Sequence, residues 1–209
     1  MLELKNISKT FNAGTVNQKV ALNGLNLTMN EGDFVTVIGG NGAGKSTMLN
    51  AIAGVFQVDT GKILIDGVDV TALPEYKRAK YIGRVFQDPM MGTAATMQIE
   101  ENLALAARRG KPRTLRPGIT KADREFYKEQ LRILDLGLED RMTTKVGLLS
   151  GGQRQALTLL MASLQTPKLL LLDEHTAALD PATAKKVLEL SDKIISDNKL
   201  TALMITHNM

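Results

Sequence analysis

The apolar positions near the N-terminus repeat every second residue. Residues 2–7 and much of residues 20–29 alternate apolar and polar side chains, which predicts two antiparallel strands joined by a turn at residues 12–14. Residues 62–65 and 68–70 flank an Asp-Gly pair, which is a strong signal for a β-hairpin. We therefore expect an antiparallel β region in the first third of the chain.

Other segments are apolar without alternation. The runs at residues 34–38 and 169–172 predict buried strands, and a similar run at residues 203–206 predicts another strand. Helix-forming stretches at residues 48–53 and 156–164 lie between them. This alternation of strands and helices predicts an α/β fold whose core is a mainly parallel sheet with flanking helices.

The middle of the chain has a different character. Residues 100–109 and 121–136 have helix-forming composition, and no β-rich run separates them. We therefore expect a single domain of 209 residues in which residues 92–145 form a helical lobe. Residues 1–91 and 146–209 would form its core.

A glycine-rich loop follows the strand predicted at residues 34–38 and opens a helix. Its sequence matches the pattern G-x-x-x-x-G-K-[ST], in which backbone N–H groups and a helix N-terminus hold phosphate oxygens. Lys45 would reach the β- and γ-phosphates, and the Ser46 hydroxyl would ligate Mg²⁺. A glycine-rich turn without a ligand is the alternative, which the strand–loop–helix context disfavours. The loop comprises Gly39, Gly40, Asn41, Gly42, Ala43, Gly44, Lys45, Ser46 and Thr47.

The second half of the chain contains further marked segments. Residues 149–153, Leu-Ser-Gly-Gly-Gln, precede a helix-like stretch. The four-leucine run at residues 169–172 ends in two carboxylates, Asp173 and Glu174. In open α/β sheets, ligands bind outside the carboxyl ends of such strands. An Ala-Leu-Asp turn ends at Asp180, and a late histidine, His207, follows the last apolar run.

Together with Gln87 after the segment Val-Phe, these motifs occur in a fixed order along essentially the whole chain. In this order the sequence resembles the ATPase subunits of ATP-binding cassette (ABC) transporters. The phosphate loop alone indicates only a nucleotide-binding protein, whereas the Leu-Ser-Gly-Gly-Gln signature with the other motifs is highly specific. The resemblance implies a P-loop NTPase core, an N-terminal antiparallel β region and a helical lobe.

The resemblance also implies catalytic roles. Asp173 would belong to the Mg²⁺ shell, and Glu174 would polarise the water that attacks ATP. Gln87 would contact Mg²⁺ or that water, and His207 would donate to the γ-phosphate. The alternatives are two surface acids closing a strand, a solvated glutamine and a structural histidine.

The resemblance further implies that the signature binds the γ-phosphate of an ATP held by a second subunit, through Ser150, Gly151, Gly152 and Gln153. Two chains facing head-to-tail would thus enclose two ATP molecules. Ser150 and Gln153 also form a helix capping box, and Asp180 is a helix N-cap with proline after it, so a capping role is an alternative that coexists with binding. The resemblance adds a contact of Asp180 across the dimer.

Phe11 is the aromatic residue that the resemblance places against adenine, and core packing is its alternative. The family commonly has proline where this chain has His175, a ring that could alter the turn or titrate near neutral pH.

The resemblance places Met90 and Met91 in a loop that faces the membrane partner, although core methionines are common. A basic cluster would be a solvated loop or a contact with anionic lipid; it comprises Arg108, Arg109, Lys111, Arg113 and Arg116.

Composition narrows these expectations only slightly. The chain has 44% hydrophobic residues, no cysteine and a formal net charge of +4. The lack of cysteine excludes disulfides and thiolate metal sites. No apolar run reaches the ~18 residues of a membrane span, and the N-terminus lacks the pattern of a secretory signal. Family members usually continue past the late histidine, so we expect the natural C-terminus to be longer.

The resemblance implies an ATP-hydrolysing subunit that energises transport of a solute by a separate membrane permease, through ATP-driven head-to-tail dimerisation. It would lie on the inner face of the cell membrane, with ATP and Mg²⁺ as its cofactors. Its expected partners are a second copy of the chain, a separate transmembrane permease and an extracytoplasmic solute-binding protein. Loose similarity favours a small organic solute such as an amino acid. The alternatives are a soluble ABC ATPase acting on nucleic acid or ribosomes, and a nucleotide-binding module without turnover. No nucleic acid is expected, because the two cassettes, coiled coils or zinc-binding cysteines usual in such relatives are missing.

Overall fold

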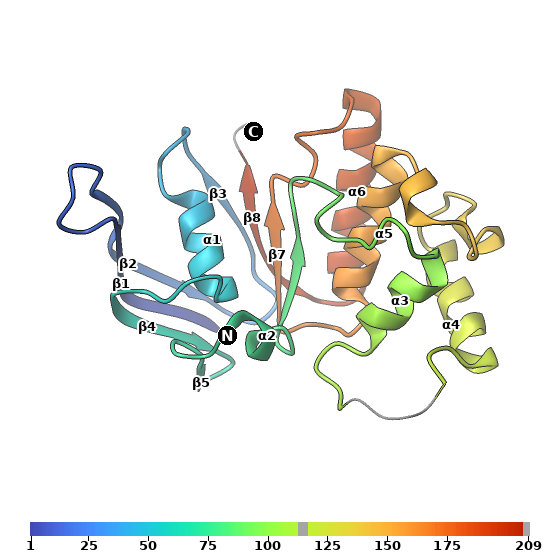
Figure 1. The fold of residues 1–209 in the computed structure, drawn as a ribbon, viewed down its shortest axis with the longest axis horizontal. Coiled ribbons are helices and arrows are strands. Elements are labelled where there is room, and N and C mark those ends of the chain that lie inside the picture. Colours follow the sequence, from blue (N-terminus) through green and yellow to red (C-terminus); the bar gives the residue numbers. More distant parts are fainter. Residues whose placement is uncertain (113–116, 207–209) are drawn as a thin grey trace. The chain divides into compact units, whose positions relative to one another are not determined.

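The computed structural model describes residues 1–112 and 117–206 of the chain. They form two compact units, each built from segments that are separate in the sequence. The first unit comprises residues 1–83, 168–173 and 200–209, and the second comprises residues 84–167 and 174–199. The predicted α/β fold class is confirmed, with an antiparallel sheet, a mainly parallel sheet and flanking helices (Figure 1).

The strands and helices follow the predicted order. The strands are β1 (Leu2–Phe11), β2 (Lys19–Met29), β3 (Phe34–Ile38), β4 (Thr60–Ile65), β5 (Val68–Asp69), β6 (Ile82–Val85), β7 (Leu169–Asp173) and β8 (Thr201–Thr206). The α-helices are α1 (Lys45–Ala53), α2 (Glu75–Arg78), α3 (Ile99–Ala107), α4 (Lys121–Arg132), α5 (Gly151–Ser163) and α6 (Pro181–Asp197). Two short 3₁₀ helices are η1 (Leu138–Asp140) and η2 (Val146–Leu148).

The antiparallel sheet has the strand order β2-β1-β4-β5. Leu2 pairs with both Met29 and Ile65, so three fully buried side chains meet on one face of the sheet. This register follows from the alternation in the sequence, because a shift of one residue would move every apolar side chain to the opposite face. The predicted hairpin is also present, as β4 and β5 pair antiparallel.

The second sheet has the order β3-β8-β7-β6. β8 pairs in parallel with β3 on one side and with β7 on the other. The prediction that residues 34–38 form a buried strand is wrong: β3 is an edge strand among the described residues, and Phe34 and Ile38 are 44% and 48% exposed. An apolar run of this length does not reveal its place in the sheet, whereas β7 has neighbours on both sides and leucines that are 0% exposed.

Helix α1 packs into the core of the first unit. Its buried face shares one apolar cluster with residues of both sheets, including Leu2, Ile63, Leu171 and Leu203. A buried arginine, Arg78, closes its C-terminal end. Its guanidinium donates to the carbonyls of four residues, namely Ala51, Ile52, Thr71 and Leu73.

The second unit contains the longer helices. α3 and α4 are joined by a bidentate ion pair in which Arg124 donates to both carboxylate oxygens of the buried Glu100. The helix expected at residues 121–136 ends earlier, at Arg132, because Asp135 and Gly137 have φ angles of 51° and 65° that a helix cannot contain. No helix in the described ranges is both long enough and apolar enough to cross a membrane.

Candidate functional site

The phosphate loop lies between β3 and α1 of the first unit, as the sequence predicts. The helix begins at Lys45, inside the motif, so the loop residues lead directly into its first turn. Asn41, Gly42, Ala43 and Ser46 are exposed. The first amides of a helix have no acceptor within the helix, and the partial positive charge there favours an anion. This arrangement can therefore hold phosphate oxygens.

Gly44 and Lys45 fix the shape of this loop. Gly44 has φ 86°, and a Cβ at this position would lie 2.6 Å from the carbonyl oxygen of Ala21. Only glycine fits such a backbone conformation at such a close approach. The Lys45 Nζ donates to the carbonyls of Gly39 and Gly40 at 2.6 and 3.0 Å. The ammonium group is thus hydrogen-bonded to the backbone of the phosphate loop.

Asp173 lies at the same sheet edge as the phosphate loop. In the parallel ladders, Ile38 pairs with Thr206, and Asp173 pairs with Ile205. The carboxyl ends of β3 and β7 therefore meet the same edge, with β8 between them. Two strand spacings of about 4.8 Å place the start of the loop and Asp173 within reach of one small ligand.

The oxygen groups at this edge suit a magnesium ion. Mg²⁺ prefers one or two protein oxygen ligands together with phosphate oxygens and water. The exposed Ser46 hydroxyl and the half-buried Asp173 carboxylate supply such oxygens in the first unit. These two oxygen donors fit a metal that is shared with a phosphate ligand.

Phe11 ends β1 in an aromatic cluster that the sequence did not predict. Its ring meets Phe56 edge-on, with centroids 5.3 Å apart, and the Lys9 Nζ lies 5.7 Å from both ring centroids. Lys9 also pairs with Asp59 at 2.7 Å. Phe11 is half-buried and keeps part of its ring exposed. Its stacking on adenine stays a prediction.

The signature segment starts α5 in the second unit. The Ser150 side chain accepts from the Gln153 backbone N–H at 3.3 Å, and the Gln153 side chain accepts from the Ser150 N–H at 3.2 Å. This is the predicted capping box. The helix begins at Gly151 rather than at residue 156, so both glycines belong to its first turn. Anion binding here stays a prediction.

Gly152 and Asp180 come together because the starts of α5 and α6 are in contact. A Cβ on Gly152 would lie 2.2 Å from the Thr183 Cγ2, so this position admits no side chain without movement. Asp180 caps α6 by accepting from the Thr183 N–H at 3.1 Å. Hydrogen bonding to Thr183 lowers the pKa of the Asp180 carboxyl, which keeps it ionised. The capping role proposed for Asp180 is confirmed.

Gln87 is exposed and follows β6. The residue before it is anchored to α5, because the Gln155 side chain donates to the Phe86 carbonyl at 3.1 Å. Met90 and Met91, farther along this loop, are 50% and 69% exposed, so the core alternative is wrong for both. The sequence signal that could have identified Gln155 is its position two residues after the signature.

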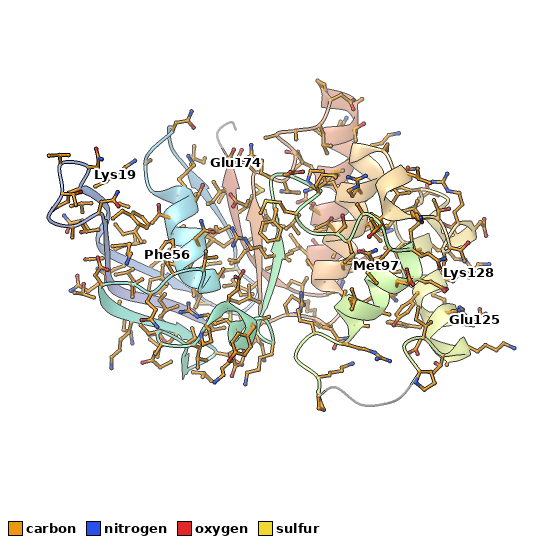
Figure 2. The ribbon with its side chains drawn as sticks, viewed as in Figure 1. Lys19, Phe56, Met97, Glu125, Lys128 and Glu174 are labelled. Carbon is orange, nitrogen blue, oxygen red and sulfur yellow. The ribbon has the colours of Figure 1, made fainter. Side chains whose placement is uncertain are left out.

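Glu174, which is labelled in Figure 2, follows directly on β7 in the chain. Its φ of 45° places the backbone in the left-handed region, which is unusual for a glutamate. Its carbonyl accepts from the Ala177 N–H at 2.9 Å, so the chain turns here. The next residue, His175, is 2% exposed and contacts Ser191 of α6 at 3.0 Å. Burial lowers the pKa of His175 to about 4, so the expectation that it titrates near neutral pH is wrong.

His207 lies outside the described residues, as do Arg113 and Arg116 of the basic cluster.

Arg109 is not a solvated loop residue, because its guanidinium donates to the Ala162 carbonyl at 3.0 Å and burial lowers its pKa. Ser191 carries no sequence signal at all, since only the packing of α6 brings it to His175.

Comparisons with known proteins agree with this geometry. The family model described as "ABC transporter" matches residues 22–177. The chain is 44% identical to a tyrosine transport ATP-binding protein of Clostridioides difficile, over all of this chain and 83% of that protein. It is 38% identical to the methionine import ATP-binding protein MetN of Corynebacterium diphtheriae, of which it spans only 59%.

Solved structures point the same way. The ATP-binding cassette MJ0796, a dimer in a post-hydrolysis state with ADP and Pi, has a TM-score of 0.82 and 32% identity to this chain. The match covers the whole chain and 88% of that cassette. The same cassette is also described as a bacterial ABC transporter cassette. With a family model over most of the chain and a relative similar over its whole length, this chain belongs to the ABC transporter family, as an ATP-binding subunit that hydrolyses ATP.

Proposed function

We propose that this chain energises the import of an amino acid through a separate membrane permease. The observation that carries this proposal is the 44% identity over the whole chain to a tyrosine transport ATP-binding protein. Methionine import proteins at 34–38% identity support the same substrate class. The chain would lie on the cytoplasmic face of the membrane, and an extracytoplasmic solute-binding protein would deliver the amino acid.

The phosphate loop binds ATP in this proposal. The backbone amides of residues 39–47 hold the phosphates, and Lys45 moves from the loop carbonyls to the β- and γ-phosphates. Ser46 and Asp173 hold Mg²⁺, Asp173 through water, and Gln87 contacts the ion or the attacking water. Mg²⁺ neutralises charge that develops on the phosphate oxygens. Phe11 stacks on the adenine, supported by Phe56.

Glu174 orients and polarises the water that attacks the γ-phosphate, and His207 donates to that phosphate. Phosphoryl transfer needs chiefly positioning and charge neutralisation, so one well-placed carboxylate is sufficient. The supporting observation is that β7 ends with Asp173 at the same sheet edge as the phosphate loop. Glu174 is the next residue in the chain.

Two chains pair head-to-tail in this proposal. The amides at the start of α5, from Ser150 to Gln153, bind the γ-phosphate of ATP held by the partner, and the Asp180 turn contacts the partner. The contact between Gly152 and Thr183 supports this, because it brings the signature and the Asp180 turn to one surface of the second unit. Closure around ATP would drive the permease, and hydrolysis would reset it.

Activity and transport test the proposal separately. Purified chain should hydrolyse Mg·ATP, Lys45→Ala should lose nucleotide binding, and Glu174→Gln should bind ATP but lose about 10²–10⁴-fold in turnover. A Glu174→Gln protein as active as wild type would contradict the role of this carboxylate.

Uptake of labelled tyrosine and methionine is then measured in cells of the source organism whose chromosomal copy carries Glu174→Gln. We expect amino acid uptake to fall while uptake of a labelled sugar stays unchanged. Unchanged uptake of every amino acid tested would refute the substrate class while leaving the ATPase role intact.

A further inference from the structure

The backbone of Glu174 is held in a conformation that its own side chain does not favour. Its φ is 45°, in the left-handed region where residues with a Cβ pay a steric penalty and where glycine or asparagine is usual. Such conformations persist when the surrounding structure over-determines them, and they cluster at functional sites. We therefore ask which contacts of the residues after Glu174 hold its backbone in this conformation.

The first such contact belongs to the turn itself. The Ala177 N–H donates to the Glu174 carbonyl at 2.9 Å, and the Leu179 N–H donates to the Thr176 carbonyl at 3.1 Å. These bonds close the turn, but they tie it only to itself. They do not fix its direction relative to a rigid element.

The second contact supplies that direction. His175 is 2% exposed, and its Nε2 lies 3.0 Å from the Oγ of Ser191, a residue of α6 that is also 2% exposed. The Ser191 hydroxyl donates its single proton to the Val187 carbonyl at 2.8 Å. The Ser191 oxygen must then accept, so the imidazole carries a proton on Nε2 and donates it to Ser191.

Helix α6 is a firm support for this bond. It spans 17 residues, has Asp180 as its N-cap, and buries Val187, Ile194 and Ile195 on the face that carries Ser191. A histidine at position 175 does not fix its own φ, because only proline does so through its ring. The hydrogen bond to α6 therefore supplies a tertiary restraint on this turn.

We propose that His175 and Ser191 form a positioning pair that holds Glu174 in its left-handed conformation and so directs its carboxylate. Neither residue touches the reacting atoms; both act through the backbone of Glu174. This inference rests on the proposed role of Glu174 in hydrolysis. Without the pair, the φ of Glu174 can relax toward negative values, which swings the side chain away from its working direction.

The test uses the full chain and steady-state hydrolysis of Mg·ATP. His175→Leu removes the donor, Ser191→Ala removes the acceptor, and His175→Gln keeps an N–H donor near the position of Nε2. We expect the first two variants to lose about 10–100-fold in kcat with KM within twofold of wild type. His175→Gln should retain at least half of the wild-type kcat, and the double variant should fall no lower than its parents.

Ile194→Val is the matched control. It removes one methylene from the same buried face of α6 and should lower the melting temperature, like Ser191→Ala, without lowering kcat. The inference is overturned if His175→Leu and Ser191→Ala keep wild-type kcat, if His175→Gln falls as far as His175→Leu, or if Ile194→Val loses as much as Ser191→Ala.

Glu174→Gln separates this inference from the proposed function. If that variant hydrolyses ATP like wild type, the proposed role of Glu174 fails, and the inference fails with it. If it loses activity while the pair variants do not, only the positioning inference fails.

Discussion

Two adjacent glycines at the start of α5 differ in what surrounds them. A Cβ on Gly151 would lie 3.5 Å from the Leu179 Cδ2, which is ordinary contact, whereas a Cβ on Gly152 would lie 2.2 Å from the Thr183 Cγ2. The two glycines of the signature are therefore not equivalent. Gly152 is needed for the packing of α5 against α6, whatever ligand the helix start binds.

We predict that Gly152→Ala destabilises the protein by about 1–3 kcal/mol, because the new methyl group overlaps Thr183. Gly151→Ala should be neutral or slightly stabilising, since alanine loses less backbone entropy on folding. The measurement is urea unfolding followed by circular dichroism. Thr183→Ser removes the Cγ2 and should restore most of the stability of Gly152→Ala; no rescue would mean that the clash is not the cause.

His175 should also make stability depend on pH. Its pKa is lowered from 6.5 to about 4 by burial, so the folded state holds it neutral while the unfolded chain takes up a proton below pH 6.5. The unfolded state then binds more protons, and the free energy of unfolding falls as pH drops from 6.5 to about 4. The total effect is about 3 kcal/mol, and it levels off below that range.

This prediction is checked by unfolding wild type and His175→Gln across that pH range. Carboxylates elsewhere titrate in both proteins, so the difference between the two curves isolates the histidine. Parallel curves would contradict the prediction.

At the scale of elements, α1 is defined at both ends by the backbone of glycine. Gly44 precedes it and Gly54 follows it, each with φ 86°. At the C-terminal end, the guanidinium of Arg78 donates to the carbonyls of Ala51 and Ile52, where the helix dipole favours a cation. The C-terminal end of the helix that carries Lys45 is therefore held by the arginine that ends α2.

We predict that Arg78→Ala lowers the free energy of unfolding by on the order of 3 kcal/mol, because buried carbonyls at the end of α1 lose charged donors. Arg78→Lys should recover only part of this loss, since an ammonium cannot reach four carbonyls that the planar guanidinium spans. Chemical denaturation of the three proteins measures both effects. Equal stability of Arg78→Lys and wild type would show that charge alone is sufficient.

The whole molecule consists of two units whose segments interleave in the sequence. The chain leaves the first unit after β7 and returns to it at β8. Helix α6, which belongs to the second unit, therefore connects two neighbouring strands of the first unit. The dimeric cassette MJ0796 shares this fold at a TM-score of 0.82. Ligand binding, pairing of chains and folding are therefore expected to be linked in one equilibrium.

We predict that ATP and Mg²⁺ stabilise the Glu174→Gln chain by about 2.7 kcal/mol at a ligand concentration of 100 times Kd. If ATP also pairs two chains, the melting temperature with ATP should rise with protein concentration, whereas the melting temperature with ADP should not. Differential scanning calorimetry at several protein concentrations provides the measurement. A melting temperature with ATP that is independent of protein concentration would contradict pairing in solution.

Much of the fold was predictable because local patterns determine it. The phosphate loop, the capping box at Ser150 and the N-cap at Asp180 depend on residues within a few positions of each other. Side-chain alternation sets the antiparallel register, and the leucine run sets β7. Local sequence patterns are therefore sufficient to predict the family, the order of elements and the place of the phosphate loop in the chain.

Contacts between residues that are distant in the chain follow from the packing of the elements and not from local patterns. Such contacts join Phe11 with Phe56, Gln155 with Phe86, and His175 with Ser191. The edge position of β3 likewise depends on the order of strands in the sheet. No local pattern encodes such contacts, because they depend on which faces of the elements pack together. The same reason explains the pKa of His175. The residue type alone predicts titration near neutral pH, whereas burial lowers the pKa to about 4.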